Sequence, residues 1–184
     1  MSFNFADGST QTTASGILEK IWVPCDGRTV STKSGNNMSI TNVTDEQSFG
    51  GTNYYDCNGS SIVPTGTTLV IYEYAFQTCR WDAHGIAHFK FQIDSTVITN
   101  SYFSLSMQQQ LEDICHFKFP INIGGSTNND TGQLASWGSS RTLVLRGRRY
   151  GGSNEQRIHK TEYSDGSGTQ RFHQPYVGVT AVAA

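Results

Sequence analysis

Two histidines with the spacing of metal ligands stand at the start of a predicted strand. His84 and His88 lie four residues apart in the stretch HGIAH. On a helix they would share one face and could bind one zinc ion, as in HExxH. Here Gly85 and the apolar alternation after it predict a strand, on which four residues span about 13 Å. That is too far for two ligands that each lie about 2 Å from one ion. We therefore predict no metal site within one chain, although a ring of one imidazole per subunit around a threefold axis could still surround an ion.

Residues that could catalyse hydrolysis do not have the spacing that known catalytic motifs require. The stretches WGSSR and GGSNE lack the GxSxG spacing of a nucleophile elbow. The adjacent carboxylates Asp45–Glu46 and Glu112–Asp113 would point to opposite faces of a strand instead of converging. Neither GxxxxGK[ST] nor a strand-linked GxGxxG occurs. The sequence therefore predicts no catalytic residue, no cofactor and no enzymatic activity.

Arginines form one basic cluster, which consists of Arg141, Arg146, Arg148 and Arg149. On a strand Arg146 and Arg148 share one face, and Arg149 lies on the other. Two interpretations stay open. The arginines could form a solubilising, partly paired strand face, or they could contact another subunit or an anionic glycan through the planar guanidinium group.

Aromatic residues near predicted loops could add to a contact with another subunit or a glycan. Trp81 and Trp137 could serve as exposed sugar platforms or interface anchors, or they could be half-buried packing residues at strand edges. The candidates for subunit or glycan contact are therefore His84, His88, Arg146, Arg148, Trp81 and Trp137.

Composition indicates a single all-β domain that must position these residues. The 184 residues suit one domain with at most a short arm. Hydrophobic residues (36%) and charged residues (15%) are both scarce, and Gly, Ser, Thr, Asn and Gln take their place.

The net charge of -2 without a basic run argues against nucleic-acid binding. The longest apolar stretches are too short to span a membrane. The N-terminus lacks a secretory signal, so we expect synthesis in the cytosol with reduced cysteines.

Period-2 patterns, separated by turn words such as KSGNN and PTGT, predict a series of strands. The predicted strands are Gly16–Pro24, Asn37–Val43, Thr68–Gln77, Gly85–Ile93, Tyr102–Ser106, Ile114–Ile123, Arg141–Arg149, Arg157–Glu162 and Pro175–Val182. Because helices do not alternate with them, a parallel βαβ sheet is not expected. We predict a two-sheet antiparallel β-sandwich of jelly-roll type, all-β, with a short extended N-terminal arm. Residues 106–113 are expected to form a short connection or helical turn, and Gly147 is expected to mark a bulge or bend.

The letters HFKF occur twice, at residues 88–91 and 116–119. In both copies aromatic residues alternate with polar ones, and the flanking sequences share nothing. We interpret the repeat as the period of two strands, one side turned to a core and the other to solvent, and not as a duplicated histidine site.

The segment Met1–Ser15 has only Phe3 and Phe5 as large apolar residues besides its first residue. It cannot offset the entropy of ordering by itself. It is either a frayed terminus or an arm that orders on a partner or a neighbouring subunit.

Two parts of the sequence resemble virion structural proteins of tailed marine phages, especially cyanophages. FADGSTQTTA (5–14) resembles the segment [FL]-x-D-[GS]-[ST]-x-Q-[ST]-T-A of their fibre and decoration proteins. The body resembles a structural-protein domain of the same phages over GSSIVPTGTTLVIYEYAF (59–76), HGIAHFKFQID (84–94), WGSSRTLVLRGRRYGGSNEQRIH (137–159) and TEYSDG (161–166).

The resemblance implies a trimeric jelly-roll protein on the virion surface, most simply a capsid decoration or head-fibre protein. Residues 1–16 would be the anchoring arm and residues 17–184 the jelly-roll domain. The arm residues implied in anchoring to the major capsid protein or another virion protein are Phe3, Phe5, Asp7, Gln11 and Thr12. The other expected partner is the chain itself, as a homotrimer, with neither nucleic acid nor membrane insertion. The alternative is a tail-fibre tip or receptor-binding protein that recognises a host surface glycan.

Overall fold

The computed structural model describes residues 3–4, 10–11, 16–33, 35, 37–49, 55–61, 63–80, 85–107, 113–150, 156–161 and 171–183. Over these residues the chain consists of β-strands and their connections, with one 3-10 turn at Thr99–Ser101 and no α-helix. The all-β prediction is thus confirmed.

The strands fall into two small pairs and two large sheets. In chain order they are β1 (Phe3–Asn4), β2 (Thr10–Gln11), β3 (Gly16–Pro24), β4 (Thr29–Ser31), β5 (Asn37–Ile40), β6 (Gln47–Phe49), β7 (Tyr55–Ser61), β8 (Leu69–Arg80), β9 (Gly85–Ile93), β10 (Thr96–Val97), β11 (Phe103–Met107), β12 (Asp113–Asn122), β13 (Arg141–Arg149), β14 (Gln156–Ile158), β15 (Lys160–Thr161), β16 (Arg171–Phe172) and β17 (Tyr176–Ala183).

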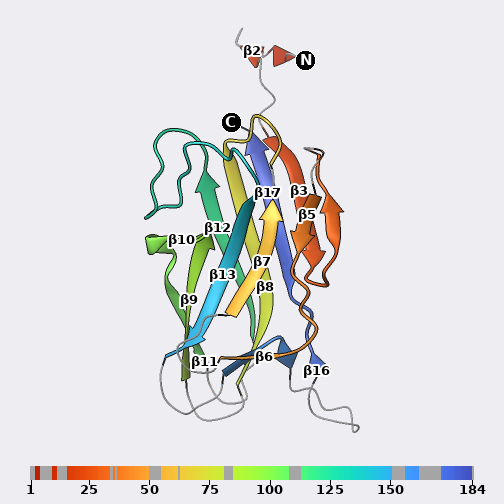
Figure 1. Ribbon diagram of the computed structural model, residues 1–184, viewed down its shortest axis with the longest axis vertical. Coiled ribbons are helices and arrows are strands. Elements are labelled where there is room, and N and C mark those ends of the chain that lie inside the picture. Colours follow the sequence, from red (N-terminus) through yellow and green to blue (C-terminus); the bar gives the residue numbers. More distant parts are fainter. Residues whose placement is uncertain are drawn as a thin grey trace.

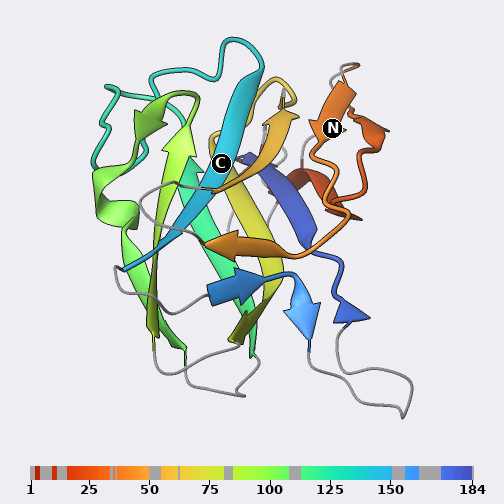
Figure 2. The ribbon, with the colours of Figure 1, turned by 60° about the horizontal axis from the view of Figure 1, so that its bottom comes forward.

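The two large sheets pack face to face as a sandwich (Figures 1 and 2). Sheet I has the order β12–β8–β17–β3, and β14 and β6 continue the positions of β17 and β3 along the far part of β8. Sheet II has the order β4–β5–β7–β13–β9, and β10 and β11 share the outer edge of β9. Every strand pair within these sheets is antiparallel, as predicted.

Strand pairing follows the jelly-roll arrangement. Among the eight long strands the first pairs with the last, the second with the seventh, the third with the sixth and the fourth with the fifth. These pairs are β3–β17, β7–β13, β8–β12 and β9–β11. Such nesting is that of a long hairpin rolled into two sheets, and it confirms the predicted jelly-roll sandwich.

Aromatic side chains from both sheets fill the core. The ring centroid of Phe91 on β9 lies 4.9 Å from that of Tyr72 on β8 and 5.0 Å from that of Phe119 on β12. Phe117 lies 5.8 Å from the same ring. The two HFKF stretches therefore face each other across the sandwich with their phenylalanines, while His116 and Lys118 are exposed on the outside. The repeat is the strand period, as predicted.

The prediction of strands failed where apolar and polar side chains do not alternate clearly, as in β7. The prediction of a bulge from a glycine within a strand failed at Gly147. Strand β7, YDCNGSS, was not predicted, because it lacks large apolar residues at period 2. The bulge expected at Gly147 is wrong: the residue pairs in regular register with Tyr55 and Phe89. In the stretch 106–113, Ser106 and Met107 belong to β11 and Asp113 belongs to β12; residues 108–112 lie outside the described residues.

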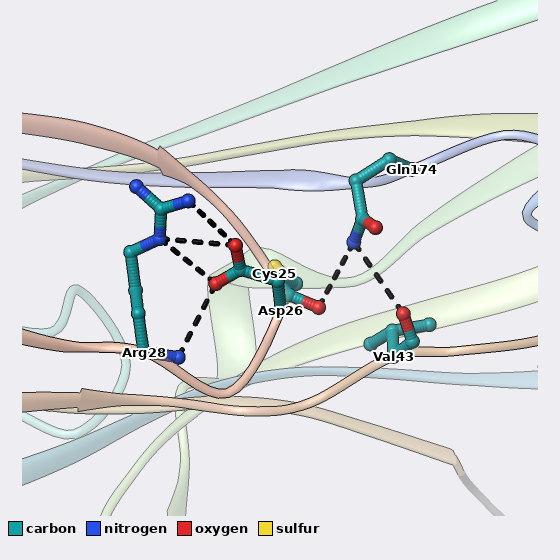
Figure 3. A network of polar contacts seen from close by, with 5 residues as sticks. All are labelled: Cys25, Asp26, Arg28, Val43 and Gln174. Atoms are coloured by element: carbon teal, nitrogen blue, oxygen red, sulfur yellow. Dashed lines mark hydrogen bonds and ion pairs between the residues drawn. The ribbon is translucent and has the colours of Figure 1, made fainter.

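A polar network joins the end of the first long strand to the start of the last (Figure 3). The side-chain amide of Gln174 donates to the carbonyl oxygens of Cys25 (2.9 Å) and Val43 (3.4 Å). The Cys25 amide donates to Pro175 O (2.9 Å). In the next turn Arg28 and Asp26 form a forked ion pair (Nη2–Oδ2 2.6 Å), and the Arg28 guanidinium holds the pKa of the Asp26 carboxyl below its usual value. The network fixes β3 beside β17.

Candidate functional site

The outer face of sheet II collects the predicted basic residues. Arg146 lies opposite Lys90, and Arg148 lies opposite His88, because β13 and β9 pair in that register. We call these four residues the basic face. Arg149 has the parity of the buried Leu145 and so belongs to the inner side. The predicted division of the arginines between two faces is confirmed.

Contacts fix the side chains of the basic face. His88 Nδ1 lies 2.7 Å from Ser104 Oγ on β11, and the His88 ring meets the Tyr150 ring edge to face at 5.0 Å. Tyr150 is 65% exposed. Arg146 donates from Nη1 to Gln92 Oε1 (3.2 Å). Guanidinium groups beside an exposed aromatic ring could bind carboxylate or sulfate groups, with a sugar ring on the tyrosine.

Trp137 lies apart from the basic face. The expectation of an exposed aromatic is wrong at this position, because the indole is 6% exposed and packs into the core cluster at one end of the sandwich. It lines a cleft of about 700 Å³ between residues 63–67 and residues 135–138. Its carbonyl oxygen accepts a hydrogen bond from Arg141 Nε (3.0 Å), so the residue holds a loop in place.

Several predicted site residues lie outside the described residues. They are Phe5, Asp7, Thr12, Trp81 and His84. For Phe3 and Gln11 the structure gives the backbone: they lie opposite each other where β1 pairs with β2. Within the part of the chain that the structure describes, no group of three or more His, Cys, Asp or Glu side chains is placed to hold a metal ion.

A second cleft at the same end was not predicted. It measures about 250 Å³ and lies between residues 93–98 and residues 127–136. Arg141 closes one side through an ion pair to Asp94 (Nη1–Oδ2 2.8 Å), and the Thr142 amide donates to Asp94 Oδ1 (3.0 Å). The glycines of IGGSTNNDTG, residues 123–132, predict a turn and no cleft. The run of amide and hydroxyl side chains in this stretch was the available signal for a polar cleft.

A charged cluster lies at the opposite end, where β14 and β15 follow each other. Glu46 pairs with Arg157 and with Lys160, whose Nζ lies 2.8 Å from Glu46 Oε2. The Lys160 side chain is only 3% exposed. Because a buried ammonium group needs a nearby opposite charge, Glu46 is the residue that makes this burial tolerable. Two cations thus share one carboxylate, at the wall of a pocket that Asp45, Arg171 and Phe172 also line.

Next to this cluster lies a histidine that the sequence interpretation did not single out. His159 is completely buried and lies edge-on to the rings of Tyr74 and Phe76. Its Nε2 is 3.4 Å from the Tyr74 hydroxyl. Burial, with a further electrostatic contribution from His173, lowers the pKa of His159 to about 3.

Comparison of the sequence with protein-family models and with curated proteins finds no match. In the described ranges no helix is long and apolar enough to cross a membrane.

Proposed function

We propose that this chain is a structural protein of a phage virion, a homotrimeric capsid decoration or head-fibre protein held to the particle by its N-terminal arm. The observation that carries the proposal is the separation of arm and body. The jelly roll is complete from β3 to β17, whereas β1 and β2 pair with each other and join neither large sheet. In Figure 1, β2 lies beyond the end of the sandwich at which β3 begins and β17 ends.

An appendage that the body does not need for its sheets is available to a partner. The arm has two phenylalanines among polar residues, so docking on the major capsid protein or another virion protein would bury apolar groups. The resemblance of residues 5–14 and of the body to marine phage virion proteins supports the same assignment. Under this proposal the chain acts by binding on the virion surface and catalyses nothing.

Deletion of Met1–Ala14 tests the proposal. We expect the truncated chain to keep the thermal midpoint of the full chain and to be lost from purified virions, because the anchor is gone and the jelly roll is intact. Quantitative mass spectrometry against the major capsid protein measures incorporation and also gives the copy number of the full chain. Tens to hundreds of copies per particle would place it on the head.

A matched pair of arm variants sharpens the test. Phe3→Ser with Phe5→Ser should reduce incorporation, and Ser2→Ala with Ser9→Ala should not. Normal incorporation of the truncated chain would overturn the assignment of the arm. Absence of the full chain from particles would overturn the virion assignment itself.

The basic face favours a second candidate, a tail-fibre tip or receptor-binding protein for a host surface glycan. An exposed Tyr150 beside His88 and Arg148 offers stacking and anion recognition together. A few copies per particle, together with binding of sulfated or uronic-acid glycans on an array, would favour this function. Dense head labelling without glycan binding would favour decoration.

A further inference from the structure

The outer face of sheet I carries several exposed apolar side chains among its polar ones, although such a face normally carries polar residues. In an antiparallel sandwich one side of each sheet packs on the core and the other meets water, which favours an alternation of apolar and polar residues. On β3 and β17, Ile17, Trp22 and Tyr176 are 64%, 40% and 38% exposed, and on β12 Ile114 is 55% exposed. Ile71 lies on the same side of β8, opposite Thr180 of β17 and Pro120 of β12.

We infer that this face is buried between copies of the chain. The inference rests on the proposed function, which calls for a homotrimer, and it names the surface that assembles it.

Charge on the face suits a second copy. Over the four long strands of sheet I the outward charged residues are Lys20, Glu73 and Lys118, and the last two form an ion pair (Nζ–Oε1 2.7 Å). A surface with so little uncompensated charge can meet its own copy without the repulsion that a strongly charged face would suffer. An acidic or basic partner would find no complementary field there.

The shape of this face also favours a protein partner over a small ligand. Trp22 lies over Gly178, where an added Cβ would come within 2.5 Å of Trp22 Cε3. The rings of Trp22 and Tyr176 are 6.0 Å apart and within 11° of parallel. The described clefts lie at the two ends of the sandwich and none is lined by these residues. A small ligand needs a concave site, whereas a broad sheet face fits another protein surface.

The area of the outer face of sheet I is of the order that a protein–protein interface needs. Four strands about 4.8 Å apart and eight residues at about 3.3 Å each cover roughly 500 Å² in plan. A standard interface buries about 800 Å² of accessible surface per partner. The accessible surface of the side chains exceeds the plan area of the sheet, and the adjoining loops add to it.

Strand addition at the β12 edge of this sheet is disfavoured. Strand β12 forms one edge, and Pro120 stands within it. Proline has no N–H to donate, so it removes one of the hydrogen bonds that an added strand would make. Sheet-to-sheet extension across β12 is thereby hindered, while the outer face remains open to packing.

Sedimentation velocity of the full chain over about 1–100 µM tests the inference. We expect the wild type to sediment as a species of three chains. Ile71→Glu should raise the dissociation constant at least about 100-fold, because it places an unpaired carboxylate in an apolar interface. The neighbouring Glu73 already shows that the monomer tolerates a carboxylate on this side of β8. Trp22→Glu, at a 40% exposed position, is the second variant in case the first disturbs folding.

Ile86→Glu is the matched control, since Ile86 is 39% exposed on the outer face of sheet II. It should leave the assembly unchanged, and circular dichroism should show that all variants fold. A wild type that is monomeric at the highest concentration would overturn the inference, as would unchanged assembly of both sheet I variants. A monomer that still enters virions through its arm would overturn this inference alone. An oligomer that is absent from virions would overturn the proposed function alone.

Discussion

At the scale of single residues, His159 has the most unusual surroundings. The sequence RIHKTEY suggests a strand in which His159 alternates outward, opposite to Ile158. Instead the backbone of His159 has φ 66°, in the left-handed region, and both residues are buried. A reversal of this kind breaks the two-residue period on which sequence prediction depends, so this burial could not be predicted from the alternation.

This burial makes stability depend on pH. The folded chain binds a proton at His159 only near pH 3, whereas an unfolded chain binds it near pH 6.5. Between these values the unfolded chain holds more protons, so the free energy of unfolding falls as the pH is lowered, by about 2 kcal/mol between pH 6.5 and about pH 4.5. Above pH 6.5 the contribution is fully present. Urea unfolding at several pH values measures it.

His159→Asn is the test variant, because asparagine tolerates positive φ and does not titrate in this range. It should be less stable at pH 7 but should lose the acid-dependent fall. His116→Asn, at an exposed position on β12, should keep that fall. If His159→Asn retained the full pH dependence, another group would have to be responsible.

At the scale of elements, Gly147 illustrates a glycine required by packing and not by backbone geometry. A Cβ at this position would lie 2.7 Å from Phe89 Cε1 and 2.8 Å from Phe49 Cζ. The two rings lie in T-shaped contact at 5.8 Å and cover the strand where β13 crosses the core. The glycine thus lets aromatic residues of both sheets approach β13.

Gly147→Ala should therefore destabilise the fold by about 1–3 kcal/mol, because the rings must shift to admit one methyl group. Urea unfolding at neutral pH measures the loss. Thr142→Ala, on the outward side of the same strand, is the control and should change stability much less. Equal effects of the two substitutions would contradict the packing explanation and indicate a general loss of strand propensity.

Elements with a clean alternation were predicted to the residue: β3, β9 and β13 have the bounds expected from the sequence. Strand β7 was not, because its place depends on pairing with β13 and β5 on either side. The same contrast holds for the candidate site. Arg146 and Arg148 could be placed on one face by counting residues. His88 joins them only through the pairing of β9 with β13, and its contact with Tyr150 depends on how the chain turns after β13.

At the scale of the whole molecule, the jelly roll ties the two ends of the body together. Strand β17 is not an edge strand, since it pairs with β3 on one side and with β8 on the other. Val177 and Val179 of β17 are buried in the core. Composition and strand count predicted the sandwich, but nothing local in the sequence shows that the first long strand needs the last one.

Removal of residues 174–184 should for this reason abolish cooperative folding, because sheet I would be split and the core opened to water. Circular dichroism should show no sharp thermal transition, in contrast to the chain that lacks Met1–Ala14. A synthetic peptide of residues 174–184 should restore the transition by inserting between β3 and β8, with Gln174 remaking its bonds to Cys25 and Val43. A truncated chain that melts cooperatively without the peptide would show that the roll closes without β17. The body would then consist of more independent parts than this pairing implies.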